Sequence, residues 1–407
     1  MKKILPVHRH AQPVDRKVMR EMNQKTLLNL IRVHAPVSRV YLKELSGLSM
    51  ATILGITSSL IDEQLVIESG VAASTGGRRA GLLEIFPSGR YAIGINLDEY
   101  TISGVLLNLN GDVIYADKWF AQLRNNCEEA VDIIAAGVEA FIARSGIAQH
   151  KILGLGCSTS GNVDKQAGVS VDSWTLNWHN VELAAPLAQR LGMPTFVDND
   201  VNCLATYERL FGSGKAFHDF LVLNRGSGVG TAFVIHDDIY RGAHNGGGEI
   251  GHVTMVPNGR LCQCGKRGCL EAYTANYGML AIYGELSQAQ TERTADMPHS
   301  VQELFARARQ GDELARRTCL DAGTMLGLGL AILVNLMNPE CVILYTGGDK
   351  GEMLLEPMNV ALKQHTFSHL DDDLPIFIEH DMNVPNWALG AGCLVLRNIF
   401  AEPKKTH

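Results

Sequence analysis

The chain has 407 residues, enough for two or three domains of ordinary size. Hydrophobic residues make up 46% and charged residues 19% of it, which excludes a disordered, collagen-like or fibrous protein. Taken for the whole chain, the net charge of −7 argues against nucleic-acid binding, but the charge is unevenly distributed. Residues 1–90 hold 13 Lys and Arg against 7 Asp and Glu, whereas the rest holds 23 against 36. A basic head on an acidic body is typical of an attached nucleic-acid-binding module, with a chance surface imbalance as the alternative.

The sequence favours a cytoplasmic, nucleoid-associated protein. The first twenty residues are polar and basic and lack the apolar segment of a secretory signal. The longest apolar stretch, residues 325–337, is short of the roughly 20 residues that cross a bilayer, so we expect a buried helix and no membrane insertion. The nine cysteines are odd in number and mostly isolated among apolar residues, which argues against a disulfide framework.

The basic head has the pattern of a helix-turn-helix. Apolar spacing and breaks predict helices over residues 23–35, 38–47 and 50–64, with Leu42 and Leu45 facing inward from the short second helix. A short helix, a Gly-containing turn and a longer helix form the plan with which many proteins read DNA. A three-helix packing module with a solvated hairpin is the alternative.

Two short strands, residues 65–68 and 82–85, are expected to flank a glycine-rich hairpin that carries two arginines. Small polar side chains on the third helix and its preceding turn can approach base edges or phosphates, and arginines on a wing suit phosphate or minor-groove contact. We therefore predict a winged helix-turn-helix over residues 1–88 that binds double-stranded DNA. Its candidate contacts are Ser49, Thr52, Thr57, Ser58, Arg78 and Arg79.

The acidic body alternates strands with helices, which predicts an α/β fold. A meander with a turn at Asn110-Gly111 opens it, and a helix is expected over residues 128–145. Strands are expected at residues 91–96, 101–108, 113–115, 152–157, 195–197, 220–224, 230–235, 342–344 and 376–379.

One imidazole and three thiols fall within eighteen positions of the body, at His252, Cys262, Cys264 and Cys269. Glycines between the thiols allow a tight loop, and the set suits a tetrahedral Cys₃His zinc site. Four protein ligands leave no open coordination position, so the sequence predicts structural zinc. Three unliganded thiols in a glycine-rich loop are the alternative.

A second group of polar residues lies on loops. Asn199 and Asp200 follow the predicted strand 195–197, Glu249 lies in a glycine-rich loop, and Glu271 comes two residues after the last thiol. Carboxylates and amides pair naturally with sugar hydroxyls, and loops after strand ends are where α/β folds hold ligands. Together these residues predict a site for a polyhydroxylated ligand, although each acid alone is an ordinary surface residue.

Two further features stay open at the level of sequence. The run from Arg225 to Gly230 follows a strand and fits either a phosphate-cradling turn or a tight hairpin. Trp174 and Trp178 fit either stacking on a sugar or burial in the core.

The body resembles the ROK family (repressors, open reading frames and sugar kinases). The resemblance rests on Glu249-x-Gly-His252, on the run from Cys262 to Glu271, and on Asn199-Asp200-x-Asn202. With the head included, the chain is similar to the sugar-responsive repressors of that family. We expect a homodimer or a dimer of dimers. The resemblance implies a two-lobed actin-like sugar kinase body, with lobes at 89–200, completed by a helix at 385–407, and at 201–384. It implies zinc on the Cys₃His set and a sugar site at Asn162, Asn199, Asp200, Glu249, His252 and Glu271.

One departure from the family separates this chain from its kinases. The kinases hold nucleotide phosphate on a strand that ends in Asp-x-Gly-Gly-Thr, whereas here residues 96–100 read Asn96-Leu-Asp-Glu-Tyr100. Two acids in place of the glycines repel phosphate oxygens at about 5 Å by several kcal/mol. The sequence therefore predicts a protein that is not an enzyme.

The resulting hypothesis is a repressor of carbohydrate uptake or catabolism genes that a sugar or sugar phosphate releases from its operator. One alternative is a sugar kinase with an appended regulatory head. Another is a repressor that a sugar-transport protein controls. The sequence does not separate glucose, N-acetylglucosamine, xylose or their phosphates as effector.

Overall fold

The computed structural model describes residues 16–71, 81–290, 297–346, 352–368, 374–379 and 386–400. The chain forms two compact units. The first contains residues up to Tyr91 together with 108–110 and the residues from Leu396 onward, and the second contains 92–107 and 111–395.

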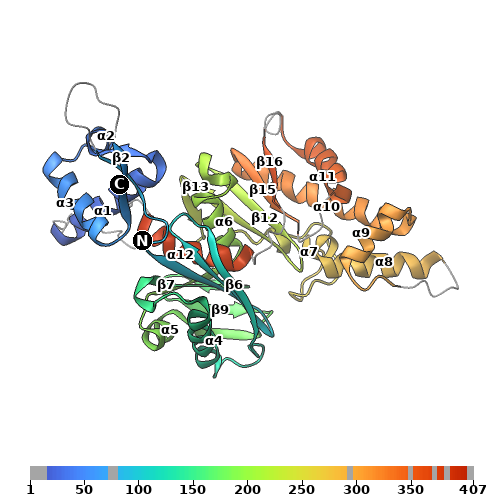
Figure 1. The fold of residues 1–407 in the computed structure, drawn as a ribbon. Coiled ribbons are helices and arrows are strands. Elements are labelled where there is room, and N and C mark those ends of the chain that lie inside the picture. The colour runs from blue at the N-terminus through green and yellow to red at the C-terminus, as the bar shows by residue number, and fades with distance from the viewer. Residues whose placement is uncertain are drawn as a thin grey trace, which may run out of the picture. The chain divides into compact units, whose positions relative to one another are not determined.

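The first unit contains three helices followed by a hairpin (Figure 1). Its elements are α1 (Arg16–His34), β1 (Val37–Ser38), α2 (Arg39–Ser46), α3 (Met50–Asp62), β2 (Val66–Val71) and β3 (Gly81–Ile85), and the strands pair in the order β1-β3-β2. Ser38 and Ser49 cap the starts of α2 and α3, because each hydroxyl accepts a backbone N–H of the first turn. Gly47 ends α2 with a φ of 69°, a conformation that favours glycine. The order of a helix, a short helix, a glycine-containing turn, a longer helix and a hairpin agrees with the order expected from the sequence.

Two details of the first unit differ from the expectation. Helix α1 begins at Arg16 and not near residue 23, because the polar residues before the apolar stripe are mostly good helix formers. Leu45 is exposed, whereas Leu42 is fully buried among the helices. The two-turn helix α2 therefore has a narrower buried face than its apolar spacing predicts.

Arg39 of α2 links this helix to α3 and β2. Its Nε donates to Thr57 Oγ1 of α3 at 3.0 Å, and its Nη1 pairs with Glu68 of β2 at 2.7 Å.

The second unit is built on two five-stranded sheets. The first sheet runs, in spatial order, β11 (Thr195–Asn199), β7 (Ile152–Thr159), β4 (Tyr91–Leu97), β5 (Thr101–Asn108) and β6 (Val113–Phe120). The second runs β14 (Asp238–Tyr240), β13 (Val229–Ile235), β12 (Phe220–Arg225), β15 (Cys341–Tyr345) and β16 (Ile376–Glu379). In both, three consecutive strands form a meander and two later strands extend the first strand on its other side, so the two lobes share one topology.

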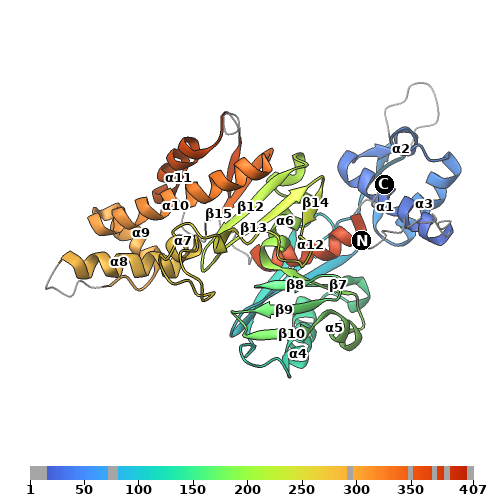
Figure 2. The ribbon, with the colours of Figure 1, turned by 180° about the vertical axis from the view of Figure 1, so that it is seen from behind.

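Helices and a small sheet complete the lobes. Near the first sheet lie α4 (Ala130–Ser145), α5 (Ala184–Leu191) and the three-stranded sheet of β8 (Asn162–Asp164), β9 (Val169–Ser173) and β10 (Trp178–Glu182), which Figure 2 shows from behind. The second lobe adds α6 (Asp200–Leu210), α7 (Glu271–Thr274), α8 (Asn276–Gln290), α9 (Val301–Gln310), α10 (Glu313–Met337) and α11 (Glu352–His365). Short 3₁₀ turns are η1 (Gln149–Lys151), η2 (Ser213–Ala216) and η3 (Ile250–His252). This architecture confirms the predicted α/β class.

Helix α10 contains the apolar stretch of residues 325–337 and is long and apolar enough to cross a bilayer. Of the most apolar 18-residue stretch of this helix, 56% is buried inside the protein. Leu326, Leu330 and Val334 pack against α11 and the second sheet, so α10 is the buried core helix that the sequence predicts.

Helix α12 (Asn386–Phe400) packs directly on the first sheet. A Cβ at Gly94 of β4 would lie 2.0 Å from the Ala388 carbonyl oxygen, and one at Gly156 of β7 would lie 1.8 Å from the Ala391 carbonyl oxygen. The backbones of strand and helix are therefore in contact, and only glycine fits at these two strand positions.

Candidate functional site

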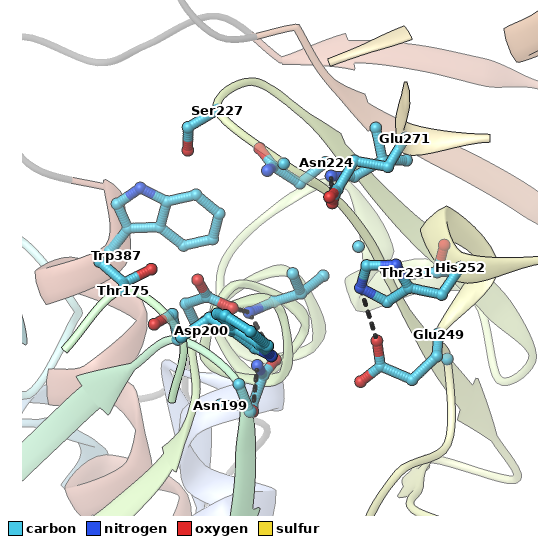
Figure 3. A pocket seen from close by; sticks show the side chains of 18 of the residues that line it. Thr175, Asn199, Asp200, Asn224, Ser227, Thr231, Glu249, His252, Glu271 and Trp387 are labelled. Atoms are coloured by element: carbon cyan, nitrogen blue, oxygen red, sulfur yellow. Dashed lines mark hydrogen bonds and ion pairs between the residues drawn. The ribbon is translucent and has the colours of Figure 1, made fainter. Parts of the chain in front are cut away.

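A cavity of about 640 Å³ lies between the two lobes of the second unit (Figure 3). Its walls come from the ends of β4 and β11, the β12–β13 turn, the glycine-rich loop before η3, and the starts of α8 and α12. The lining includes Asn199, Asp200, Glu249, His252 and Glu271, so residues widely separated in sequence converge as expected. Of the six candidate sugar-binding residues, the cavity brings together all but Asn162.

Asn199 and Asp200 occupy the junction of β11 and α6. Asn199 caps α6 by accepting the backbone N–H of Val201 at 2.9 Å, and its amide donates to the Gly161 carbonyl at 2.9 Å. Asp200 is the first residue of α6, and desolvation by burial raises the pKa of its carboxyl to about 7. The helix N-terminus favours a carboxylate there, but burial dominates.

A buried ion pair fixes this junction against the opposite lobe. Asp198, the fully buried residue before Asn199, accepts both terminal nitrogens of Arg241 at 2.7 and 2.6 Å. Arg241 leads into the glycine-rich loop that carries Glu249. A bidentate Arg–carboxylate pair fixes orientation as well as distance, so it holds the start of this loop against the end of β11.

His252 lies between the cavity and the thiol group. Its Nε2 is 4.0 Å from Glu249 Oε2, and its Nδ1 is 3.8 Å from Cys262 Sγ. The two ring nitrogens therefore face different groups, and one imidazole can serve both the cavity and a metal ion.

The four predicted metal ligands lie together. The ligand atoms of His252, Cys262, Cys264 and Cys269 are all within 4.8 Å of one another. The sulfurs of Cys264 and Cys269 are 3.8 Å apart, which is the edge of a tetrahedron with metal–sulfur bonds of about 2.3 Å. Gly265 and Gly268, with φ of 83° and 81°, form the tight loop between the thiols. The donor set and its spacing fit a tetrahedral metal ion.

Glu271 begins α7 directly after this loop. Its Oε2 accepts the backbone N–H of Val229 at 3.0 Å, and its Oε1 accepts the hydroxyl of Tyr277 at 3.4 Å. Only 8% of Glu271 is exposed. The residue thus connects the thiol loop to the β12–β13 turn in addition to lining the cavity.

The run from Arg225 to Gly230 is a hairpin turn between β12 and β13, in which Gly226 N–H donates to the Gly228 carbonyl at 2.9 Å. Arg225 is fully buried below it, donates from Nε to the Thr274 carbonyl at 2.8 Å, and lies 5.6 Å from the centre of the Phe305 ring. Its guanidinium belongs to the core, so the run from Arg225 to Gly230 is a hairpin turn in which Arg225 is not available to a phosphate.

Asn162, Trp174 and Trp178 were candidates for contact with a sugar, and the structure places them in three different environments. Asn162 is outside the cavity lining and donates from its side-chain amide to the His244 carbonyl at 3.3 Å. Trp178 is fully buried and donates from Nε1 to the Leu123 carbonyl at 3.0 Å, so it is a core residue. Trp174 is 68% exposed and lines the cavity.

Several residues that line the cavity were not predicted from the sequence. Figure 3 shows the Trp387 indole facing the cavity on the side away from His252 and Glu249. Thr231 is buried in the lining, and its hydroxyl has no hydrogen-bond partner in the structure. No local pattern marks these residues, because Trp387 and Thr231 reach the cavity only through the packing of α12 and β13. The additional uncharged polar residues of the lining include Asn96, Thr175, Asn224, Ser227 and Asn276.

The candidate DNA-contacting residues divide into three groups. Ser58 and Ser49 are exposed and Thr52 is half-buried, and the hydroxyls of Ser49 and Thr52 lie 2.8 Å apart at the start of α3. The expectation that Thr57 lies on the exposed face is wrong. Thr57 is fully buried, since α3 turns this side toward Arg39 and the hairpin. Arg78 and Arg79 lie outside the described residues.

Comparison with known proteins matches residues 92–398 to the ROK family model. A putative xylose repressor of Caldicellulosiruptor sp. (strain Rt8B.4) is 31% identical over 86% of this chain and 89% of its own length. The xylose repressor of Bacillus subtilis is 28% identical over 94% and 97%, and the Escherichia coli DNA-binding transcriptional dual regulator NagC is 28% identical over 95% of each chain.

Two solved structures show the same fold. A ROK family transcriptional regulator described as a homolog of the E. coli MLC protein has a TM-score of 0.83 at 23% identity and covers 94% of this chain and 97% of its own. A ROK family glucokinase from Streptomyces griseus, solved with glucose and AMPPNP, has a TM-score of 0.64 at 24% identity and covers 75% and 98%. The family match spans the whole second unit and agrees with its two-lobed architecture and its cavity. The chain belongs to the ROK family.

Proposed function

We propose that this protein is a DNA-binding transcriptional repressor that responds to a sugar and controls genes of carbohydrate uptake or catabolism. The observation that carries the proposal is a unit of three helices and a hairpin that precedes, in the chain, a ROK body whose cavity is lined by carboxylates. The xylose repressor of Bacillus subtilis matches 94% of this chain and NagC 95%, so both matches include most of the head, whereas the glucokinase covers 75% of the chain.

In this proposal α3 enters the major groove from its Ser49 end, and the hairpin with Arg78 and Arg79 contacts phosphates or the minor groove. Two heads of a homodimer, or of a dimer of dimers, bind a roughly palindromic operator. Sugar in the cavity changes the equilibrium between arrangements of the heads, which requires that it bind one arrangement more tightly than the other. Such a protein acts in the cytoplasm on the nucleoid.

The first turn of the body supports a role other than catalysis. The Asp98 N–H donates to the Thr101 carbonyl at 3.0 Å, and the Glu99 N–H donates to the Asp98 side chain at 2.8 Å. Glu99 also pairs with Arg124 at 2.9 Å. The backbone N–H groups of Asp98 and Glu99 are therefore engaged, and carboxylates stand in the path of a nucleotide phosphate.

One observation favours a second candidate, a sugar kinase with a regulatory head. The pKa of Asp200, about 7, would suit a general base that takes a proton from a sugar hydroxyl. ATP-dependent phosphorylation of a hexose by the purified protein would support this candidate and overturn the proposal. A third candidate, a repressor controlled by a sugar-transport protein, would retain operator binding but show no release by sugar.

We further propose that His252, Cys262, Cys264 and Cys269 hold a structural zinc ion. Nδ1 of His252 would complete the set, which leaves Nε2 toward the cavity. The ion supplies no open position for chemistry. Its role would be to hold the loop from which His252 and Glu271 reach the cavity.

The proposal is tested by operator binding of the full-length protein to its own upstream DNA in a gel-shift assay. We expect a complex that weakens steeply as salt rises, because lysines and arginines displace counterions from phosphates, and that dissociates with one sugar of a panel. Ser58→Ala should weaken the complex, whereas Ser287→Ala, in α8 of the other unit, should not. Salt-independent binding together with no footprint would contradict DNA recognition.

A further inference from the structure

We infer that the effector is a neutral, unphosphorylated glycoside longer than one sugar ring. Its first ring lies among Asp200, Glu249 and His252, and its second ring or apolar aglycone stacks on Trp387. This inference rests on the proposed function and adds to it the chemical class of the ligand.

The charge of the cavity argues against phosphate. Its described lining contains five carboxylates, at Asp98, Glu99, Asp200, Glu249 and Glu271, and neither a lysine nor an arginine. Phosphate is recognised by arginine, lysine or free backbone N–H groups, and a phosphate among carboxylates is repelled. A sugar hydroxyl, in contrast, donates to each of these oxygens. The lining therefore selects a ligand that carries hydroxyls and no negative charge.

The arginines close to the cavity are committed elsewhere. Arg124 pairs with Glu99 and donates to the Thr175 carbonyl at 2.6 Å, which ties the first turn of the body to the β9–β10 loop. Arg241 is held by Asp198 in a bidentate pair, and Arg225 lies in the core. Releasing Arg124 or Arg241 for a phosphate would take the arginine away from a carboxylate, and in the case of Asp198 from a fully buried one.

The size of the cavity argues for a ligand of more than one ring. Its 640 Å³ falls within the roughly 300–1,000 Å³ of sites for drug-sized ligands, and Asp200, Glu249 and His252 form only part of its lining. Figure 3 shows Asp200 below the Trp387 indole on one side of the view, with His252 and Glu249 on the other side. A ring held between Asp200 and Glu249 thus leaves the face of the indole open to a second group.

The walls of this second space suit a sugar or an aromatic aglycone. The indole of Trp387 offers an apolar face on which the C–H face of a pyranose or an aryl ring can stack. Ser227 and Thr175 stand near it in Figure 3, and Asn224 lines the same cavity. Uncharged donors and acceptors around an aromatic platform recognise neutral hydroxylated ligands. A nucleotide, which could also stack on Trp387, is excluded by its phosphates.

Isothermal titration of the full-length protein tests the inference. The probes are glucose, galactose, mannose and N-acetylglucosamine, each as free sugar, 4-nitrophenyl glycoside and 6-phosphate, together with cellobiose, maltose, xylose and xylobiose. We expect one disaccharide or aryl glycoside to bind at least ten-fold more tightly than its monosaccharide, and the matching 6-phosphate at least ten-fold more weakly than the free sugar.

Substitution of the indole separates the two rings. Trp387→Ala should lower affinity for the extended glycoside at least ten-fold while affinity for the monosaccharide stays within about two-fold. Trp387→Phe keeps a ring in place if the alanine variant is unstable, and should retain part of the extra affinity. Phe367→Ala, which removes an aromatic ring that is 76% exposed and outside the cavity, is the matched control and should change neither affinity.

Three results would overturn the inference: tighter binding of a 6-phosphate, equal affinity for monosaccharide and extended glycoside, or equal loss of both in Trp387→Ala. Absence of binding by every probe would also overturn it. Failure of the proposed function is recognised separately, by the absence of a salt-dependent operator complex with the same preparation.

Discussion

At the scale of one residue, the ionised carboxylate of Asp200 suits sugar binding but costs folding stability. The carboxyl is the first residue of α6, with Oδ1 accepting the Val201 N–H at 2.8 Å, yet burial in the cavity raises its pKa from 3.8 to about 7. A group whose folded pKa exceeds its unfolded pKa binds its proton more tightly in the folded state. Ionisation of Asp200 therefore costs folding free energy, and this cost grows between about pH 4 and pH 7 and stays constant above.

Asp200→Asn should remove this cost. We expect the variant to be more stable than the parent at pH 8 by about 1 kcal/mol or more, seen as a melting temperature higher by about 2–4 °C, and to lose this advantage toward pH 4. Sugar affinity should fall about 10- to 100-fold, since a charged acceptor is lost.

The measurements are calorimetric melts across pH and titration with the sugar that binds the parent protein. Glu182→Gln, which neutralises an exposed acid in β10 outside the cavity, is the control and should change neither property. A stability difference that does not vary with pH would show that Asp200 is not the titrating group.

At the scale of elements, α12 depends on two strand glycines for its position. A side chain at Gly94 would meet the helix backbone at Ala388 and at the nitrogen of Gly392, 2.3 Å away. Neither atom can move without shifting α12 itself, whose first turn presents Trp387 to the cavity. The close packing of strand on helix therefore positions part of the ligand site.

Gly94→Ala should destabilise the second unit by about 3 kcal/mol, the upper range for overpacking a core, and should weaken sugar binding as α12 moves. Urea unfolding measures the first effect and titration the second. Gly246→Ala is the matched control for stability, because nothing lies within 4 Å of its Cβ position, and it should change the unfolding free energy by no more than about 1 kcal/mol. Equal effects of the two substitutions would refute the packing argument.

At the scale of the whole molecule, the cavity depends on both lobes and on the thiol loop that separates its carboxylates. Asp200 comes from the junction after the first sheet, whereas Glu249, His252 and Glu271 come from the second lobe. The thiol loop joins His252 to Glu271. A metal ion held there would therefore influence sugar binding through the positions of these two cavity residues.

Removal of zinc should therefore lower sugar affinity at least ten-fold and lower the melting temperature, without any catalytic effect. Elemental analysis should find one zinc ion per chain in the parent protein and less than one in Cys264→Ser. Cys127→Ser, which changes an exposed thiol outside the cluster, should leave zinc content and sugar affinity unchanged. Full sugar affinity in the metal-free protein would contradict this role of the loop.

Much of the local structure could be predicted because it depends on neighbours in the sequence. Apolar periodicity located the helices of the head and the main strands of both sheets, and the serine caps and Gly47 bounded α2 and α3. The thiol loop was equally predictable, since its donors lie within eighteen positions and short chain segments have few ways to bring them together. The small strands β1, β8, β9, β10 and β14 were missed because two to five residues carry little periodicity.

By itself the sequence determined the α/β class, the helices of the head, the thiol loop and the residues that carry carboxylates. Only the tertiary structure decided that Thr57 is buried, that Arg225 belongs to the core, and that Trp387 closes the far side of the cavity. These outcomes depend on contacts between segments far apart in the chain, such as Thr57 with Arg39 and α12 with β4. Local patterns record which face of an element is apolar, but the direction in which that face packs is set by the elements it meets.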